Sequence, residues 1–291
     1  MEKDSNESDA AERTGVFTSG IVSTAQKQTI ALFFTGRQHA GENLADVLQH
    51  RADELAPPMQ MCDALSRNLP KLPEKLEVIV GHCLAHARRR FVEVIENFPQ
   101  PCQHVLEQLG KIYGNDATAR QQAMTAEERW RYHQQHSAPV MEELRVWLNT
   151  QFAEKKVEPN SGLGIAMRYL LKHWERLTLF LRQPGAPLDN NIAERALKKA
   201  ILHRKNSLFY KTANGARVGD LFMSLIHTSE LSGANPFDYL TQLQLHADEL
   251  AHDPSAWMPW NYRATVEAAG VPGGPGVGSL EWTSGTHLDS G

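Results

Sequence analysis

Residues 78–91, with the sequence VIVGHCLAHARRRF, pass directly from a β-branched apolar run into a helical pattern. The run at 78–80 predicts a short strand, and the pattern at 84–97 predicts a helix. Upstream, the run MQMC at 59–62 predicts another short strand, which ends on Asp63. An acidic residue in that position stands at the mouth of a sheet, where α/β proteins form their ligand sites.

Two further runs rich in β-branched and aromatic residues lie at 15–24 and 28–35. Only a few polar residues separate them, so they predict a hairpin. Apolar residues at helical spacing predict a helix at 42–55, which the following pair of prolines ends. This order of strands and helices indicates an α/β fold with a mixed sheet.

The second half of the chain is mainly helical in pattern. From residue 102 to 182 apolar residues recur at helical spacing, and packing is the simplest explanation of these stripes. After a break that contains Pro and Gly, a helix restarts near Asp189, a favourable N-cap residue. Residues 213–232 predict another helix ended by Gly233, and Asn235 followed by a proline starts the next.

Composition limits the class of protein. The chain has 291 residues, 41% of them hydrophobic, which is enough for one large domain or two modest ones. The net charge is −4, so any affinity for DNA must come from local basic patches. Three cysteines argue against a disulfide framework and for a reducing compartment. No apolar run approaches the roughly 20 residues that span a bilayer, so we expect a cytoplasmic protein without membrane contact.

Two acids are candidates for chemistry. Asp63 is one, although it could instead be a surface aspartate that caps residues 66–69. Glu194 is the other; it lies about one turn inside a helix, where the helix dipole favours a glutamate without any further role. Position alone does not decide between these readings.

A basic run follows Glu194. Between Arg195 and Arg217 there is no Asp or Glu, which predicts a local positive surface suited to phosphate, although a merely solvated face is the alternative. The basic residues of this run are Arg195, Lys198, Lys199, Arg204, Lys205, Lys211 and Arg217. Arg88, Arg89 and Arg90 form a second cluster. Cys83 and His86 have metal-ligand spacing, but no second pair stands near them, so the indication of zinc is weak.

Five segments, taken together, resemble the insertion-sequence-66 family of bacterial transposases. They are QMCDAL (60–65), CLAHARRRF (83–91), LDNNIAER (188–195), RKNSLF (204–209) and GANPFDYL (233–240). They occur in the family's order and cover about residues 15–250. Five segments in order make the resemblance specific, although none of them is decisive alone.

The resemblance implies a ribonuclease-H-like enzyme of the DDE type, which cleaves DNA strands and transfers them to a target. In that family three acids hold two divalent ions, normally Mg²⁺; the second acid matches Asp63 and the third matches Glu194. Transposon ends and target DNA are the implied partners, and assembly into multimers is a further family expectation. The implied DNA-binding residues are Arg88, Arg89, Arg195, Lys198, Lys199, Arg204 and Lys205. The Cys83/His86 pair resembles a structural pair of related enzymes.

The implied organisation has four parts. A polar lead at 1–14 precedes a ribonuclease-H-like catalytic domain at 15–232, with a helical insertion at about 100–185. A helical C-terminal segment at 233–267 and a flexible tail at 268–291 follow.

The chain departs from the family at the first acid, which ends a first strand upstream of the hairpin. That strand lies between the second and the fourth, so without it the hairpin and the Asp63 strand have no shared neighbour. Our hypothesis is a partial, N-terminally truncated or frameshifted copy that folds poorly alone and does not cut DNA. The alternatives are a non-catalytic DNA-binding remnant or regulator, and an unrelated helical interaction protein.

Overall fold

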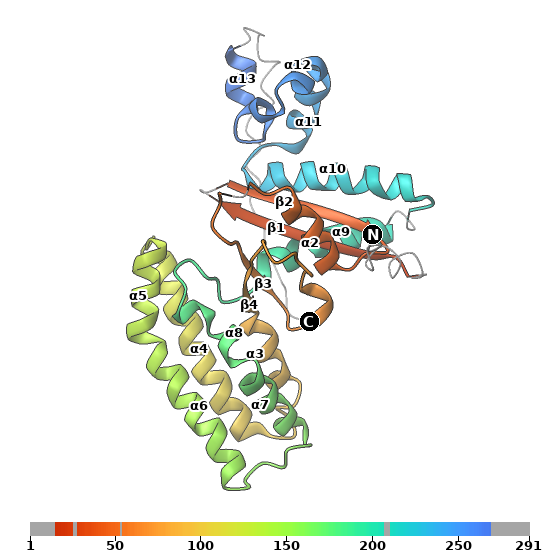
Figure 1. Cartoon of the computed structure of the whole chain (residues 1–291). Helices are drawn as coiled ribbons and strands as arrows, with labels where there is room; N and C mark the ends of the chain where they lie inside the picture. Colours follow the sequence, from red (N-terminus) through yellow and green to blue (C-terminus); the bar gives the residue numbers. More distant parts are fainter. Residues whose placement is uncertain (1–14, 26–27, 53, 207–209, 269–291) are drawn as a thin grey trace, which may run out of the picture. The chain divides into compact units, whose positions relative to one another are not determined.

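The computed structural model describes residues 15–25, 28–52, 54–206 and 210–268 (Figure 1). The predicted polar lead and nearly all of the predicted tail lie outside these residues. The chain divides into two compact units: residues up to 21 together with 33–217, and residues 22–32 together with 218 onward. Within the described residues no helix is long and apolar enough to cross a bilayer.

A parallel pair of strands lies in the first unit. Strand β3 (Met59–Cys62) pairs with β4 (Ile79–His82), and Cys62 lies opposite His82. The ladder continues for one step, because the Cys83 amide donates to the Cys62 carbonyl over 2.8 Å. The 3₁₀ helix η1 (Ser66–Asn68) lies in the connection, and α3 (Leu84–Val92) follows β4. Both strands therefore end at the same edge.

The hairpin forms a second two-stranded sheet from β1 (Phe17–Ala25) and β2 (Gln28–Gly36), followed by α2 (Ala40–Gln49). The α/β class is thus confirmed. Among the described residues, β1–β2 and β3–β4 are separate two-stranded sheets. This separation agrees with the expectation that the hairpin and the Asp63 strand have no shared neighbour.

The predicted helical stretch consists of five helices and one 3₁₀ turn. They are α4 (Pro99–Gln121), α5 (Ala126–His136), α6 (Ala138–Ala153), α7 (Gly162–Lys172), α8 (Trp174–Leu177) and η2 (Leu179–Leu181). Helix α3 ends at Val92, earlier than the predicted residue 97, and a turn region leads to Pro99, which fits the first turn of α4. Similarly, α2 ends at Gln49 rather than at residue 55.

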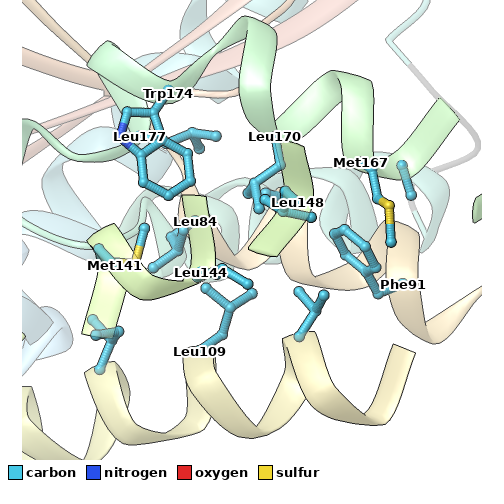
Figure 2. Close-up of a cluster of buried hydrophobic side chains, with 14 of the residues drawn as sticks. Leu84, Phe91, Leu109, Met141, Leu144, Leu148, Met167, Leu170, Trp174 and Leu177 are labelled. Atoms are coloured by element: carbon cyan, nitrogen blue, oxygen red, sulfur yellow. The ribbon is translucent and has the colours of Figure 1, made fainter. Parts of the chain in front are cut away.

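These helices share one apolar core with α3. Figure 2 shows Leu84 and Phe91 of α3 in a cluster of side chains from α4, α6, α7 and α8. The labelled members from those helices are Leu109, Met141, Leu144, Leu148, Met167, Leu170, Trp174 and Leu177. Full burial of a Leu or Phe side chain contributes about 1.5–3 kcal/mol, so this core fixes the position of α3.

Two longer helices follow, α9 (Asn191–Asn206) and α10 (Ala213–Leu231). Gly233, with φ +71°, lies just beyond α10 in the left-handed conformation that glycine adopts without strain. In the second unit, Ala31 of β2 is held by Thr228 of α10. The Thr228 hydroxyl accepts from the Ala31 amide over 3.1 Å and also contacts the Ala31 carbonyl at 3.2 Å.

The segment after α10 contains α11 (Pro236–Leu245), α12 (Ala247–His252), η3 (Pro254–Trp257) and α13 (Tyr262–Ala268). The Asn235 side chain accepts from the amides of Phe237 and Asp238, so the predicted N-cap is confirmed. Tyr239, Leu243, Trp257 and Tyr262 form its small core. The Tyr239 hydroxyl donates to the Trp257 carbonyl over 3.0 Å, which joins α11 to η3.

A buried polar network joins α4 to α5. Asp116 accepts from Arg129 Nε over 2.7 Å and contacts His133 Nε2 at 3.2 Å. The other ring nitrogen of His133 lies 2.8 Å from the Ser137 hydroxyl, and Arg129 also donates to the Ala186 carbonyl. Burial alone would raise the pKa of Asp116, but the hydrogen bond with His133 and the charge of Arg129 hold that pKa below its usual value.

We expect Asp116→Asn to lower the free energy of unfolding at pH 7 by about 3 kcal/mol, because Arg129 loses its buried partner. The folded-state pKa of Asp116 is lowered, so its contribution is present above about pH 3.9, the pKa of an unfolded aspartate. That contribution is lost as the pH falls below this value. Urea denaturation at neutral and acidic pH measures the difference between wild type and variant.

The matched control is Glu127→Gln, which removes the exposed Glu127–Arg131 ion pair of α5. We expect the control to cost less than about 0.5 kcal/mol. Equal losses in the two variants would show that the Asp116 network does not stabilise the helical stretch.

Candidate functional site

The carboxyl ends of β3 and β4 carry the first group of candidate residues. Asp63 directly follows β3 and is half-buried, and Cys83 directly follows β4 and is buried. Because the strands are parallel neighbours, these two residues leave the sheet at the same edge. Asp63 is thus located where the sequence predicted, at the mouth of a strand pair.

Asp63 is held by η1 rather than capping it. The Asn68 side-chain amide donates to Asp63 Oδ1. The N-cap residue of η1 is Leu65, and η1 has no side-chain cap hydrogen bond. The Gln60 side chain of β3 donates to the Asn68 carbonyl over 2.6 Å, which fixes η1 against the strand. The capping alternative for Asp63 is therefore wrong, since the interaction is with a side chain of η1.

Helix α2 supports η1 through close backbone approach at Gly41. A Cβ atom at Gly41 would overlap the Leu69 carbonyl group. It would also lie too close to the Arg67 carbonyl oxygen. Only glycine lets α2 come this close to the chain around η1. The support of Asp63 therefore extends through Asn68 to the packing of α2.

The second group consists of Cys83, His86 and Glu194. One ligand atom from each of these side chains lies within 4.8 Å of the other two. His86 Nδ1 of α3 and Glu194 Oε1 of α9 are 3.5 Å apart. The structure therefore brings Glu194 to the CxxH pair, while Asp63 is not part of this group.

Helix α9 reaches this position because the segment before it is anchored in the core. Leu188 is buried, and its carbonyl accepts from the Leu84 amide at the start of α3 over 2.9 Å. Asp189 Oδ1 accepts from the Asn191 amide over 3.1 Å as α9 begins. The buried face of α9 carries the small residues Ala196 and Ala200. Glu194 lies in the first turn of α9, on the other side of the helix from these alanines, and its carboxylate contacts His86 of α3.

Burial controls the ionisation of the groups at this edge. It raises the pKa of Cys62 to about 11, with a further contribution from the Asp63 charge, and it also raises the pKa of Cys83. The pKa of His82 is lowered to about 4, first by burial and then by the nearby His173. At neutral pH, therefore, Cys62 and Cys83 are thiols and His82 is uncharged.

The predicted basic residues lie on α3 and α9. Arg88, Arg89, Arg195, Lys198, Lys199 and Lys205 are exposed. Lys198 and Lys205 are seven residues apart on α9 and share one face, opposite Ala196 and Ala200. Arg204 differs from the others, because it is half-buried and donates to the Thr18 hydroxyl of β1 over 2.7 Å. Its side chain therefore holds α9 to the hairpin.

Sequence reasoning missed the contact between His86 and Glu194. The spacing of Cys83 and His86 indicated a ligand pair, but a third ligand was sought only nearby in the sequence. Glu194 comes from a helix on the far side of the helical stretch, so local spacing could not identify it. The sequence did contain one signal for this contact. Segments 83–91 and 188–195 both belong to the five that carry the family resemblance, and in the structure they meet at the Leu84–Leu188 hydrogen bond.

Comparison with known proteins gives a family match. A family model described as "Transposase IS66 family" matches residues 17–218. Among curated proteins, "Uncharacterized protein y4jD" of Sinorhizobium fredii (strain NBRC 101917 / NGR234) is 33% identical over 189 residues, which are 64% of this chain and 36% of that protein. From the same organism, "Uncharacterized protein y4qI" is 30% identical over 184 residues, 62% of this chain and 33% of that protein.

The chain thus spans about a third of the length of the curated relatives that it matches. No solved structure matches the chain. The matched residues 17–218 include both acids and the Cys83/His86 pair.

We expect Gly41→Ala to destabilise the fold by about 1–3 kcal/mol, because the new methyl group has no space beside the Leu69 carbonyl. The matched control is Gly110→Ala in α4, where nothing lies within 4 Å of the added Cβ. The control should stabilise by up to about 1 kcal/mol, since alanine favours the helix more than glycine does. Thermal unfolding of both variants measures these changes; a neutral Gly41→Ala would contradict the close approach of α2.

Proposed function

Because the chain belongs to the IS66 family of transposases, which implies a function in transposition, we propose that it carries part of the DNA-cleaving centre of a DDE transposase. In this proposal Asp63 is the second acid and Glu194 is the third. The observation that supports it most is the edge at which β3 and β4 end, where Asp63 follows one strand and Glu194 is held beside the residue that follows the other.

The donor chemistry of the two acids fits Mg²⁺, which prefers oxygen ligands. Asp63 and Glu194 would hold the ions, and such ions activate the attacking oxygen and stabilise the leaving oxygen of a phosphodiester. The fit is partial, because only two of the family's three acids have a match in this chain. A third carboxylate must join them before cleavage, and we therefore assign catalysis to an assembled site and not to these two acids alone.

A ribonuclease-H-like sheet would explain why the strands form two separate pairs. In that arrangement one more strand lies between the hairpin and β3 and carries the first acid. The curated relatives that this chain matches are about three times longer than the matched segment, so such a strand has room in a longer protein. The proposal treats β1–β2 and β3–β4 as parts of one sheet that this strand completes.

The basic residues would bind the DNA backbone. Arg88, Arg89, Arg195, Lys198, Lys199 and Lys205 are exposed on the helices that carry His86 and Glu194, and they would hold phosphate groups close to the acids. Contacts of this kind give affinity without sequence preference. Transposon ends, target DNA and further copies of the chain are the partners that the family implies.

The second candidate function is a DNA-binding remnant or regulator without catalytic activity. The two-acid set and the separation of the two sheets favour it for this chain taken alone. It shares the basic surface with the first candidate and differs only in the chemistry at Asp63 and Glu194. Metal-dependent cleavage therefore separates the two functions, whereas DNA binding does not.

We expect the chain to bind duplex DNA with an affinity that falls as salt rises. Replacing Lys198 and Lys205 by Gln should reduce the slope of log K against log salt by about 1–2, which corresponds to roughly 0.9 for each lost phosphate contact. Fluorescence anisotropy with a short labelled duplex measures this slope. Lys111→Gln, an exposed lysine of α4, is the control and should leave the slope unchanged; equal slopes in all three proteins would exclude the α9 surface as the DNA site.

We expect no Mg²⁺-dependent nicking of supercoiled plasmid by the purified chain, because only Asp63 and Glu194 match acids of the family's set of three. Gel electrophoresis of the plasmid after incubation with Mg²⁺ or Mn²⁺ provides the measurement. Nicking that disappears in Asp63→Asn and in Glu194→Gln would show instead that this chain completes its own catalytic site. Nicking that persists in both variants would come from a contaminant or from other residues.

A further inference from the structure

We propose that Cys83, His86 and Glu194 form a binding site for a thiophilic divalent ion such as Zn²⁺. The three ligands come from the end of β4, from the first turn of α3 and from the first turn of α9. The site shares Glu194 with the proposed cleavage centre, but its ligand set, ion and experimental test do not depend on DNA cleavage.

The distances in the group are those of a site that needs only slight contraction. Zn²⁺ bonds of about 2.0–2.3 Å in tetrahedral geometry place neighbouring ligand atoms roughly 3.3–3.8 Å apart. His86 Nδ1 and Glu194 Oε1 are separated by 3.5 Å, which is one edge of such a tetrahedron. All three ligand atoms lie within 4.8 Å of one another, so shifts on the order of 1 Å complete the set.

Two of the three ligand atoms are buried without a hydrogen bond. Among the residues that the structure describes, neither His86 Nδ1 nor Glu194 Oε1 has a hydrogen-bond partner, although both atoms are buried. An unsatisfied buried polar atom costs about 1–3 kcal/mol. The two atoms face each other at a distance too long for a good N–H···O bond. An ion between them would satisfy both atoms at once.

The surroundings of the third ligand suit a metal-bound thiolate. Cys83 is the N-cap residue of α3 and is 1% exposed. Burial raises the pKa of the Cys83 thiol, and the backbone amides of Asn190, His86 and Ala85 oppose that rise. These amides would stabilise negative charge on the sulfur, and a coordinated ion would remove its proton, as metals do with thiols.

The donor set selects the ion. A thiolate and an imidazole suit Zn²⁺ or Co²⁺, whereas Mg²⁺ prefers an all-oxygen set. Three protein ligands leave a fourth position for water or another small ligand. Cys62, which lies on the neighbouring strand, is also buried and free but is outside the group. It therefore provides a matched control for Cys83.

A bound ion would join three separate parts of the first unit. Helix α9 is connected to α3 near the site by the Leu188–Leu84 hydrogen bond and by the contact of Glu194 with His86. Coordination of Glu194 would replace that 3.5 Å contact by two metal bonds. We therefore expect Zn²⁺ to raise the unfolding temperature of the chain.

The experiment is a titration of the reduced, purified 291-residue chain with Co²⁺, followed by displacement with Zn²⁺. Binding through Cys83 produces a thiolate-to-cobalt charge-transfer band in the near ultraviolet, which Zn²⁺ abolishes and excess Mg²⁺ does not. Cys62→Ser should keep the band, while Cys83→Ser should lose it. His86→Gln and Glu194→Gln should weaken Co²⁺ affinity by about tenfold or more.

Circular dichroism of each variant verifies that it is folded, and the conservative change Glu194→Gln keeps the test valid if Cys83→Ser unfolds. Three results would overturn the site: no band in the wild type, a band that Cys62→Ser removes and Cys83→Ser keeps, or unchanged affinity in both His86→Gln and Glu194→Gln. Loss of DNA binding or cleavage plays no part in these readouts, so failure of this inference is distinguishable from failure of the proposed function.

Discussion

The buried face of α3 is the constraint on which the candidate site depends. Leu84, Ala87 and Phe91 of this helix are fully buried among the helices of residues 99–181, and the same helix begins at Cys83 and carries His86. The strands β3 and β4 have four residues each and form an isolated pair, which has little stability of its own. The helical core therefore holds the edge at which β3 and β4 end. In other α/β proteins a larger sheet provides this rigidity. Cys83 and His86, which leave this edge, therefore take their positions from the packing of α3.

The helical stretch and the site are coupled a second time through the segment before α9. Ala186 and Leu188 are members of the same core, and the carbonyl of Ala186 also accepts from Arg129 of the buried polar network. Helix α9 thus begins from a fixed point, and Glu194 is placed by packing rather than by its own contacts. The helical stretch of residues 99–181 thus begins and ends within one core, because α3 before it and Ala186 and Leu188 after it are buried together.

The sequence allowed the local elements to be predicted well and their long-range pairing poorly. The strand at 59–62, the N-cap at Asn235 and the helix that begins just after Asp189 follow from patterns of a few residues. The ends of α2 and α3 were predicted too late, because the apolar spacing continues beyond the last hydrogen-bonded turn. Asp63 and Glu194 were candidates by their position in the chain, and only the family resemblance assigned them a role. The contact of Glu194 with His86 depends on tertiary packing across the helical stretch, which no local pattern encodes.

The hydroxyl of Thr228 has a consequence for how this protein associates. It occupies both the amide and the carbonyl of Ala31, which are the groups that the free side of β2 would otherwise offer to another chain. An exposed strand edge is a template for uncontrolled pairing, and a side chain seated on it interrupts the template. The β2 side of the hairpin sheet is therefore closed to an added strand at its middle.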